Sequence, residues 1–359
     1  MKKYLRIVVL VAVPVLLLGL LYLRSRAGGV VEVNSGYRVL MGTFSRVIVI
    51  APSQSAAQRC IEAAFDVQDR VESLMSYHRE DSELSKINRY AAERPVPVSD
   101  WMFEVLQEAV RFHELSEGAF DVTVGPLMDL WRRAGKTNVL PTEEALAEAR
   151  RKVGSDKLIL DPKNRTVRFA VEGMRVDLGG IAKGYAVDKA VEAMIKRGAR
   201  GGLVDLGGNI RVFGRAPAGQ ERWRIGLQDP NVAPDQFGGS PPLLVLEMTD
   251  ASVATSGHYR RFTKVQGQTQ SHILNPRTGA GAGALASDTI IAPDAISADA
   301  LSTAVSVLGL EKGLALIERL PAVEVILIPS DNNAVPIFSR GAESYLASAN
   351  RAVPPLENR

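Results

Sequence analysis

Apolar side chains recur along the chain with two different periods, and each period predicts one kind of element. Over residues 53–76, 99–116 and 142–153 they return every three or four positions, which is typical of helices that bury one face. Each of these segments opens beside a serine or threonine, the residue types that cap helix starts, and Gly118 marks the expected stop of the second. Three amphipathic helices are therefore expected in the first half of the chain.

Shorter apolar segments, many rich in β-branched residues, predict strands in the rest of the chain. Strand patterns are found at 37–50, 158–160, 167–169, 174–178, throughout 210–274 and at 323–328, and an extended segment is expected at 118–126. Helical patterns return at 185–196, 297–308 and 311–320. Helices and strands are thus mixed without a domain-scale linker, which predicts one large α+β domain over residues 37–345, with a tether at 30–36 and a tail at 346–359.

The N-terminus has the pattern of a targeting segment. Lys2, Lys3 and Arg6 precede an uncharged apolar run over residues 7–23, which as a helix would span roughly 26 Å, close to the ~30 Å hydrocarbon core of a bilayer. Residues 25–27 also offer a site for cleavage after a signal peptide. Residues 1–29 are therefore expected to be a signal peptide or, as we favour, an anchor in the cell inner membrane that leaves the body in the periplasm.

Charge and cysteine content exclude some classes of function. The 359 residues carry a formal charge of +3, but the first 29 hold five basic residues and no acid. The remainder has 38 basic and 40 acidic residues, a net charge of −2. No basic surface interleaved with aromatic residues is evident, so a nucleic-acid partner is not expected. The single cysteine, Cys60, can form no internal disulfide and is expected to act as a small buried apolar residue.

One four-residue sequence, Asp-Leu-Gly-Gly, occurs twice, at 177–180 and at 205–208. The first copy follows a predicted strand and is followed by Lys183 and a predicted helix. Free N–H groups at a helix start and the charge of a lysine favour an anion such as a phosphate. An ordinary strand-to-helix turn explains this stretch equally well. Because the sequence recurs after a second apolar run, the two turns are expected to face each other across one crevice.

Few polar residues remain that could carry chemistry. The chain has no Walker A sequence, zinc-protease motif, nucleophile elbow or Cys-x-x-Cys pair. Asp299 and Thr303 lie four residues apart in a predicted helix, so they share one face, and a carboxylate beside a hydroxyl suits Mg²⁺. An acid at a helix start without a ligand is the alternative. His272 ends a predicted strand and could act as a base or bind phosphate, whereas His113 is expected to be structural.

Together these segments resemble the ApbE-like flavin transferases, the FAD:protein FMN transferase family. The matching blocks occur in family order and cover about residues 37–330. They are Met41-Gly42-Thr43, Ser82 to Ser85 with Asn88, Gly118 to Thr123, Asp177 to Ala186, Gly207 to Ile210, His272 to Gly279 and Ser297 to Thr303. The resemblance implies an α+β fold related to the T-fold, and the exported location fits it.

The resemblance also implies roles for particular residues. Mg²⁺ would be held by Asp299, Thr303 and the main-chain oxygen of Gly180, and His272 would be the catalytic base or a phosphate-orienting group. The residues implied to contact FAD are Met41, His78, Ala119, Phe120, Asp121, Asp177, Lys183 and Ile273. At His78 the family often has tyrosine, so this chain departs from the pattern there.

Two functions of different classes follow. The first is Mg²⁺-dependent transfer of FMN from FAD to a Thr or Ser hydroxyl of an exported redox protein, with release of AMP; in a variant of it, water replaces the hydroxyl and FAD is hydrolysed. The second is a non-catalytic exported FAD-binding carrier or assembly factor. Because Asp299, Thr303 and His272 are all present and a pure binder would not require them, the enzyme is favoured.

Overall fold

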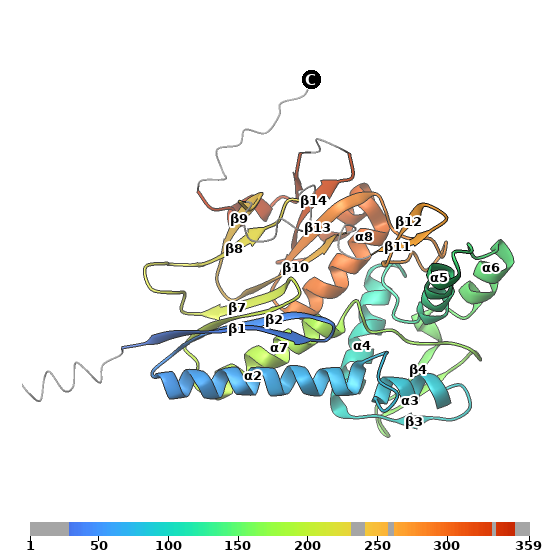
Figure 1. Ribbon diagram of the computed structural model, residues 1–359, viewed down its shortest axis with the longest axis horizontal. Helices are drawn as coiled ribbons and strands as arrows, with labels where there is room; N and C mark the ends of the chain where they lie inside the picture. The colour runs from blue at the N-terminus through green and yellow to red at the C-terminus, as the bar shows by residue number, and fades with distance from the viewer. Residues whose placement is uncertain (1–28, 231–240, 258–261, 332–334, 349–359) are drawn as a thin grey trace, which may run out of the picture.

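The computed structural model describes residues 29–230, 241–257, 262–331 and 335–348, so nearly all of the predicted N-terminal anchor lies outside the described residues. Its centre is an antiparallel sheet of eight strands (Figure 1). In spatial order these are β1 (Val31–Leu40), β2 (Thr43–Ala51), β6 (Gly201–Leu206), β7 (Asn209–Gly214), β10 (Ala251–Gly257), β13 (Leu285–Ala292), β14 (Glu324–Pro329) and β15 (Ile337–Phe338). The predicted strand over 37–50 is in fact two strands, because the chain reverses at Met41-Gly42, both with positive φ.

Most of the helices begin at a side-chain cap. They are α2 (Gln54–Met75), α3 (Glu83–Tyr90), α4 (Asp100–Leu115), α5 (Gly125–Thr137), α6 (Glu143–Arg151), α7 (Ala182–Lys196) and α8 (Ala295–Ile317). A serine, threonine or aspartate oxygen accepts the N–H three residues ahead at the starts of α2, α3, α4, α6 and α8. The starts of α5 and α7 lack such a bond. The predicted helices α2, α4 and α6 are confirmed to within a few residues.

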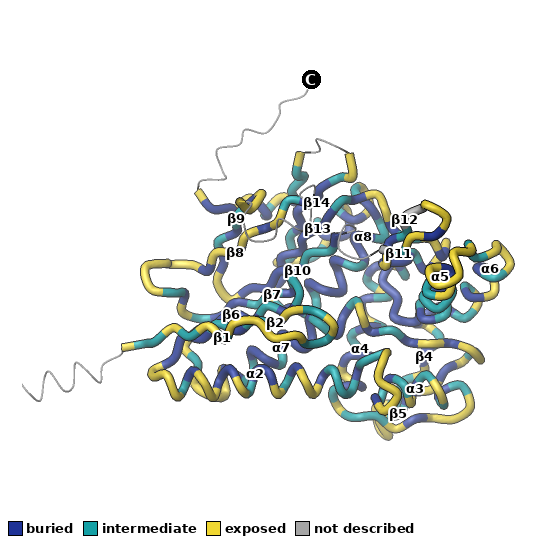
Figure 2. Tube along the Cα trace, in the orientation of Figure 1, coloured by how far each residue is buried: buried dark blue, intermediate teal, exposed yellow. Residues whose placement is uncertain are grey.

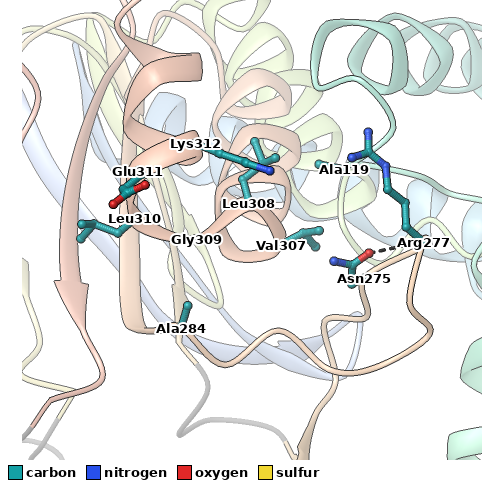
Figure 3. A pocket seen from close by; sticks show the side chains of 10 residues that line it. All are labelled: Ala119, Asn275, Arg277, Ala284, Val307, Leu308, Gly309, Leu310, Glu311 and Lys312. Carbon is teal, nitrogen blue, oxygen red and sulfur yellow. Dashed lines mark hydrogen bonds between the residues drawn. The ribbon is translucent and has the colours of Figure 1, made fainter.

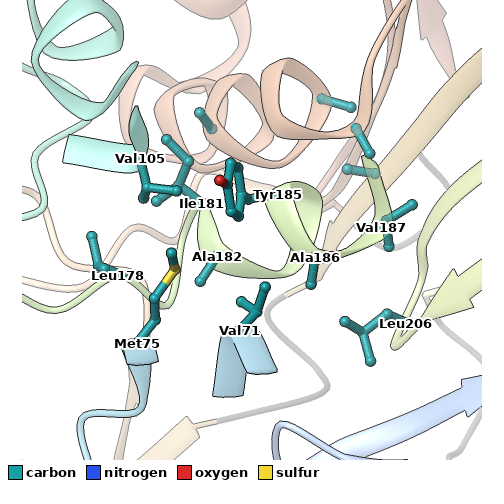
Figure 4. Close-up of a cluster of buried hydrophobic side chains, with 14 of the residues drawn as sticks. Val71, Met75, Val105, Leu178, Ile181, Ala182, Tyr185, Ala186, Val187 and Leu206 are labelled. Carbon is teal, nitrogen blue, oxygen red and sulfur yellow. The ribbon is translucent and has the colours of Figure 1, made fainter. Parts of the chain in front are cut away.

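The main core lies between one face of the sheet and the helices α2, α7 and α8. In Figure 1, α2 and α7 lie below the β1–β2 hairpin, and α8 runs beside β10 and β13, which it contacts. Figure 4 shows Leu178 and Ile181, on either side of the first glycine turn, pointing into this core beside Val71 and Met75 of α2. The first Asp-Leu-Gly-Gly segment is therefore held in place by the apolar residues around it.

A thinner second layer covers part of the opposite face of the sheet. It consists of the hairpin of β8 (Trp223–Leu227) and β9 (Leu244–Met248) and of a short 3-10 turn, η3 (Ala342–Tyr345). Ile48 and Ile50 of β2 point into this layer, whereas Val47 and Val49 point into the main core. Figure 2 shows buried residues concentrated between the layers and exposed residues along the β1–β2 hairpin.

Smaller elements form separate sheets and helices beside the central sheet. A three-stranded sheet contains β3 (Val96–Pro97), β5 (Thr166–Phe169) and β4 (Leu158–Asp161), and the hairpin of β4 and β5 is the one that the sequence predicts. Beside it, α5 and α6 enclose a small core with Leu274, near the hairpin of β11 (Phe262–Val265) and β12 (Gln268–Ser271). These elements bring residues 118–126 and 271–283 toward the start of α7.

Helix α8 runs through the core and is interrupted at Gly309, whose φ is 72°. This break explains why the sequence shows separate helical patterns before and after it. Within the described residues, α8 alone has the length and hydropathy of a membrane-spanning helix. It packs against β10, β13 and α7, so its apolar composition is that of a core helix.

Three expectations about local structure are wrong. Residues 31–36, predicted as tether, belong to β1, because Val31 and Val33 pair with β2 and pack on the main core. Residues 174–178 form only an isolated bridge between Arg175 and Val124 in place of a strand. The extended segment at 118–126 ends in the unpredicted helix α5, which begins with Gly125-Pro126 and so has a proline in its first turn.

Candidate active site

An ion pair joins the starts of the two central helices. The Nζ of Lys183, in the first turn of α7, lies 2.8 Å from Oδ1 of Asp299 in the second turn of α8. The Asp299 side chain is 7% exposed and that of Lys183 is 27% exposed. The Lys183 Nζ also donates to the carbonyl oxygen of Gly179 at 3.3 Å. A cation and a carboxylate are thus held together just beyond the first glycine turn.

Each of these two helices caps the other. Asp299 of α8 accepts the N–H of Gly184 in α7 at 2.9 Å, and Asp188 of α7 accepts the N–H groups of Ala295 and Ile296 at 2.9 and 2.8 Å. Burial raises the pKa of Asp188, while Arg211 and the two N–H groups oppose that shift. A Cβ at Gly184 would lie 2.2 Å from the carbonyl oxygen of Ala295. Only glycine therefore allows the close crossing that places Asp299 beside Lys183.

A hydroxyl and a glycine complete the predicted cation site. A Cβ at Gly180 would lie 2.9 Å from Oγ1 of Thr303 and 3.3 Å from the Phe120 ring, so the Gly180 backbone lies directly against Thr303. Asp299 and Thr303 share one face of α8, as predicted from their spacing. Gly180 thus leaves free the space beside the Thr303 hydroxyl that a Cβ would fill, and Asp299 is one helical turn before Thr303.

This donor set fits Mg²⁺. No group of three or more His, Cys, Asp or Glu that could hold a metal occurs in the described residues, and Asp299 is the one carboxylate among the three predicted ligands. Mg²⁺ is commonly bound by one or two carboxylates, with water and substrate phosphate completing its six ligands. Lys183, Gly184 and Asn209 donate to the carboxylate of Asp299, which still has room for one further partner because two oxygens offer about four lone pairs.

The second Asp-Leu-Gly-Gly segment delivers a neutral residue to the same place. Asn209 follows the turn at the start of β7 and is 5% exposed. With the amide oriented by its neighbours, its nitrogen donates to Asp299 Oδ1 at 3.0 Å and its oxygen accepts from Lys183 Nζ at 3.1 Å. The two turns therefore meet at one ion pair, in agreement with the expectation that they share a crevice.

A buried acid below the site anchors α8 against the sheet. Asp288 of β13 accepts hydrogen bonds from Ser302, at 2.7 Å, and from Ser306, at 2.5 Å, both in α8. Burial raises the pKa of Asp288 to about 7, although the two serine hydroxyls lower it. Because Ser302 precedes Thr303, this contact helps to fix the rotation of α8 and hence the direction of the Thr303 hydroxyl.

Asp177, predicted to contact FAD, forms an ion pair with a helix that the sequence did not predict. Its Oδ2 lies 3.0 Å from Nη2 of Arg132 in α5, and its Oδ1 accepts the N–H of Gly179 at 2.9 Å. The Arg132 guanidinium stacks 4.3 Å from the centre of the Tyr77 ring. Burial, followed by a hydrogen bond to Asp129, raises the pKa of Tyr77 to about 12, so its hydroxyl is neutral at physiological pH.

Asp121, also predicted to contact FAD, has its carboxylate turned into the protein. It accepts from the main chains and hydroxyls of Thr123 and Ser155, over 2.6 to 3.0 Å, and lies 3.0 Å from Nδ1 of His113. Burial alone would favour protonation, but the bonds from His113 and Thr123 hold the pKa of Asp121 below its usual value. Any contact from Asp121 to FAD would therefore come from its main chain, and His113 is structural, as expected.

The other predicted ligand residues are spread around this centre. Ala119 and Phe120 are buried in the loop that contacts Gly180, while Ile273 is buried and His272 is exposed just beyond β12. Met41 is at the tip of the β1–β2 hairpin, where its N–H donates to Glu72 at 3.0 Å. The exposed His78 stacks edge-on against Tyr77. The structure thus groups Gly180, Lys183, Asp299, Thr303 and Phe120, and contact of the others with FAD stays a prediction.

Comparison with known proteins identifies the family. The sequence profile of the ApbE family matches residues 41–327. The chain belongs to the ApbE family. It is 35% identical over 307 residues to the FAD:protein FMN transferase of Treponema pallidum, which covers 82% of this chain and 83% of that protein.

Solved structures agree with this assignment. The ApbE protein of Thermotoga maritima matches with a TM-score of 0.77 at 31% identity, over 88% of this chain and 99% of that one. The flavin transferase ApbE of Vibrio cholerae matches with a TM-score of 0.74 at 30% identity, over 89% and 99%. The predicted α+β fold of an ApbE protein is therefore confirmed.

In this ApbE chain, sequence reasoning missed Asn209, Arg132 and Tyr77. Asn209 gave the only available signal, since it follows the repeated Asp-Leu-Gly-Gly and lies within a family block. Arg132 and Tyr77 are 45 and 100 residues from Asp177 in the sequence, and nothing local indicates that Arg132 pairs with Asp177 or that Tyr77 lies against Arg132. Their positions depend on how α5 packs, which could not be derived from an unpredicted helix.

A cavity of about 520 Å³ lies beside this centre, along the second half of α8 (Figure 3). Ala119 and Asn275 line one side, and Val307 to Lys312 around the Gly309 break line the other. Val307 follows Asp299 and Thr303 at the same four-residue spacing, so the two predicted cation ligands and the cavity lie along one face of α8. Arg277, Lys312 and Glu311 also line it, so two basic side chains stand against one acidic one.

Proposed function

We propose that the chain is an FAD:protein FMN transferase, which moves FMN from FAD to a Thr or Ser hydroxyl of another protein and releases AMP. The observation that carries this proposal is the cluster of Lys183, Asp299, Thr303 and Gly180, into which both glycine turns lead. The names of its ApbE relatives support the same reaction. A protein that only carried FAD would not require a buried acid paired with a lysine.

In the reaction, the acceptor oxygen attacks the phosphorus on the flavin side of the pyrophosphate. The bond to the bridging oxygen breaks, its electron pair leaves with AMP, and the acceptor proton passes to a base, for which His272 is the candidate. Lys183 would bind the pyrophosphate oxygens and stabilise their growing charge. Asp299, Thr303 and the Gly180 carbonyl would hold Mg²⁺, which when bound lowers the negative charge that the nucleophile meets.

The cavity along α8 supplies room for one end of FAD. Its apolar lining of Ala119, Val307 and Leu308 suits a flat ring, and its position next to Thr303 would leave the pyrophosphate at the cation site. Arg277 and Lys312 would add favourable charge for the phosphates. Phe120 would then separate the ring site from Gly180, which it contacts in this structure.

The acceptors are proposed to be exported redox proteins, with this chain anchored in the cell inner membrane and facing the periplasm. The basic residues at 2, 3 and 6 and the apolar run at 7–23 support this location. Reporter domains fused after Val30 would be active only on the outer side of the membrane. Activity of such a fusion in the cytoplasm would contradict the topology.

The direct test combines purified residues 30–359, FAD and Mg²⁺, with AMP as the product measured. Asp299→Asn keeps the shape of the side chain and removes its charge, so it should abolish AMP release at millimolar Mg²⁺. Asp66→Asn, which makes the same change at an exposed carboxylate on α2, is the matched control and should retain activity. His272→Ala should slow transfer by roughly 10²-fold with FAD affinity nearly unchanged. If the protein bound FAD tightly but released no AMP under any condition, the transferase would be ruled out and the non-catalytic FAD carrier would remain.

A further inference from the structure

An exposed apolar surface lies at the tip of the β1–β2 hairpin. Tyr37, Val39 and Phe44 are 65%, 71% and 63% exposed, and together they form what we call the hairpin patch. Among the described residues, these three are the most exposed of the large apolar side chains. The others with high exposure, such as Val139, Ile159 and Ile195, come from separate elements.

The patch belongs to the same sheet face that the second layer covers elsewhere. Phe44 pairs with Val39, and Arg46 pairs with Tyr37, after a bulge between Asn34 and Tyr37 that shifts the register of β1. Further along β2, Ile48 and Ile50 point to the same side and pack into the second layer. The sheet face is therefore covered in one part and exposed in the part that carries the patch (Figure 2).

The three side chains have a defined arrangement. The Tyr37 and Phe44 rings meet edge to face with centroids 6.2 Å apart, and the Arg46 guanidinium lies 5.4 Å from the centre of the Tyr37 ring. Aromatic residues and arginine are enriched at the centres of protein–protein interfaces. Side chains that are already ordered also lose less entropy when a partner binds.

The patch is directly connected to the candidate active site. The carbonyl of Phe44 accepts the N–H of Gly207 at 2.9 Å, and Thr43 packs against Gly207. Two residues beyond Gly207, Asn209 contacts both Lys183 and Asp299. The patch lies on the face of the sheet opposite to α7 and α8, so a partner on it would reach the place proposed for the pyrophosphate around the end of the sheet that Thr43 and Gly207 form.

We propose that the hairpin patch is the docking surface for the acceptor protein, resting on the proposed transferase function. The acceptor would present apolar side chains beside its Thr or Ser hydroxyl. Three side chains of these types bury roughly 500 Å² at most, less than the ~800 Å² per partner of a standard stable interface. This size suits a substrate that must leave after each transfer, and it is too small for a stable dimer of this chain.

Photocrosslinking tests the identity of the partner. The full chain with p-benzoylphenylalanine at Phe44 would be produced in its source cells and irradiated, with the same group at Ile159 as the control. Ile159 is 51% exposed on β4, in the separate three-stranded sheet. We expect a crosslinked band from position 44 alone, and the captured protein should carry covalent FMN, seen as flavin fluorescence on a denaturing gel.

Kinetics with the captured acceptor then test the role of the patch. Tyr37→Thr, Val39→Thr and Phe44→Thr combined should raise KM for the acceptor by about tenfold or more. The Kd for FAD and the release of AMP with water as acceptor should not change, because the altered side chains point away from the core. Ile159→Thr should leave all three quantities unchanged.

Several results would overturn the proposal. One is a normal acceptor KM in the triple variant; another is a crosslink from position 44 only to a second copy of the chain or to lipid. Absence of a crosslink in cells that do contain flavin-labelled proteins would have the same meaning. If deleting the chain removed no flavin-labelled protein and the purified chain released no AMP, the transferase function itself would be wrong, and the docking surface with it.

Discussion

The two Asp-Leu-Gly-Gly segments share four residues but continue into different structures. After 177–180 the chain enters α7, whereas after 205–208 it reverses and returns as β7. In both, the aspartate side chain accepts a glycine N–H, from Gly179 at 2.9 Å and from Gly208 at 3.0 Å. The acid and the glycines therefore set only the local turn, and the residues that follow select helix or strand.

The glycines of the two segments are needed for different reasons. Gly207 and Gly208 have φ of 64° and 90°, a region that strongly favours glycine. Gly180 instead leaves space, since a Cβ there would press on Thr303. The first turn leads to the charge of Lys183 and, in the proposed site, to a cation ligand at Gly180, and the second leads to the neutral amide of Asn209. The same four-residue sequence thus needs glycine for its positive φ in the second segment and for the space beside Thr303 in the first.

Removing the charge that follows the first turn should have the largest effect. Lys183→Met should slow Mg²⁺-dependent AMP release by roughly 10³-fold at saturating FAD, because the pyrophosphate loses its main protein cation. The rate would be measured by quantifying AMP over time. Lys189→Met, on the same helix but paired with Glu104, is the control and should be near the unaltered rate. A Lys183→Met protein with normal turnover would remove the first turn from catalysis.

Exchanging glycine for alanine in each turn separates the two reasons for glycine. Gly207→Ala should lower the free energy of unfolding by about 2–4 kcal/mol, from its positive φ and the crowding of Thr43. Gly180→Ala should cost less stability but raise the Mg²⁺ concentration needed for activity, because Thr303 must move. Denaturant unfolding and Mg²⁺ titration of AMP release measure the two effects. The reverse pattern would contradict the distinction.

The uncharged amide of Asn209, which follows the second turn, should contribute less to the rate of AMP release than Lys183 does. Asn209→Ala removes one donor to Asp299 and one acceptor from Lys183, so we expect about a tenfold loss of rate. Ion-pair geometry should also change, which would appear as a different Mg²⁺ dependence at fixed FAD. Equal losses in Asn209→Ala and Lys183→Met would mean that the two turns contribute alike.

The smallest expected effect is a pH-dependent change in stability from the His113–Asp121 pair, which should alter the first Asp-Leu-Gly-Gly turn and leave the second unchanged. The hydrogen bond to Asp121 raises the pKa of His113, and the pKa of Asp121 is lowered. The stabilisation that comes from the raised pKa of His113 is fully present below the unfolded pKa near 6.5 and is lost as pH rises through the folded pKa. The stabilisation that comes from the lowered pKa of Asp121 is present above the unfolded pKa of about 4 and is lost as pH falls through the folded pKa. The pair is thus most stabilising between roughly pH 4 and 6.5.

His113→Gln should therefore reduce the free energy of unfolding by about 1 kcal/mol near pH 5 and by less above pH 7. The loop at 119–123 holds the first turn through the bond from the Asp177 N–H to Val122, at 2.7 Å. Hydrogen exchange at the Asp177 N–H should become faster in the variant, and exchange at the Gly208 N–H should not. Equal changes at both amides would show that the two turns are not independent.

The parts of the fold that could be predicted have signals within one window of sequence. The sequences of α2, α4 and α6 combine apolar periodicity with a capping residue. The break in α8 at Gly309 is visible in the sequence as two separate helical patterns. The spacing of Asp299 and Thr303 likewise predicts a shared face. α5 was missed because Gly125 and Pro126 look like a turn, and its arginines dilute the apolar pattern.

The rest of the site depends on contacts between distant segments. The Arg132–Asp177 ion pair and the inward direction of the Asp121 carboxylate both require the packing of α4, α5 and η1 (Ser155–Lys157) to be known. The hydroxyls that satisfy Asp121 come from residues 123 and 155, which no local pattern connects. Side-chain direction in an irregular loop is set by such partners and could not be derived from the loop itself.

The Lys183–Asp299 ion pair has a thermodynamic consequence for the proposed reaction. Each of the two side chains would bind a different ligand, because the carboxylate of Asp299 would bind Mg²⁺ and the ammonium of Lys183 would bind the pyrophosphate. One ligand alone would leave the other charge without its partner in a mostly buried place, which is unfavourable. FAD and Mg²⁺ should therefore bind cooperatively, each raising the affinity for the other by the same factor. Release of AMP and transfer of FMN would then weaken retention of the cation, so the metal would enter and leave with each nucleotide.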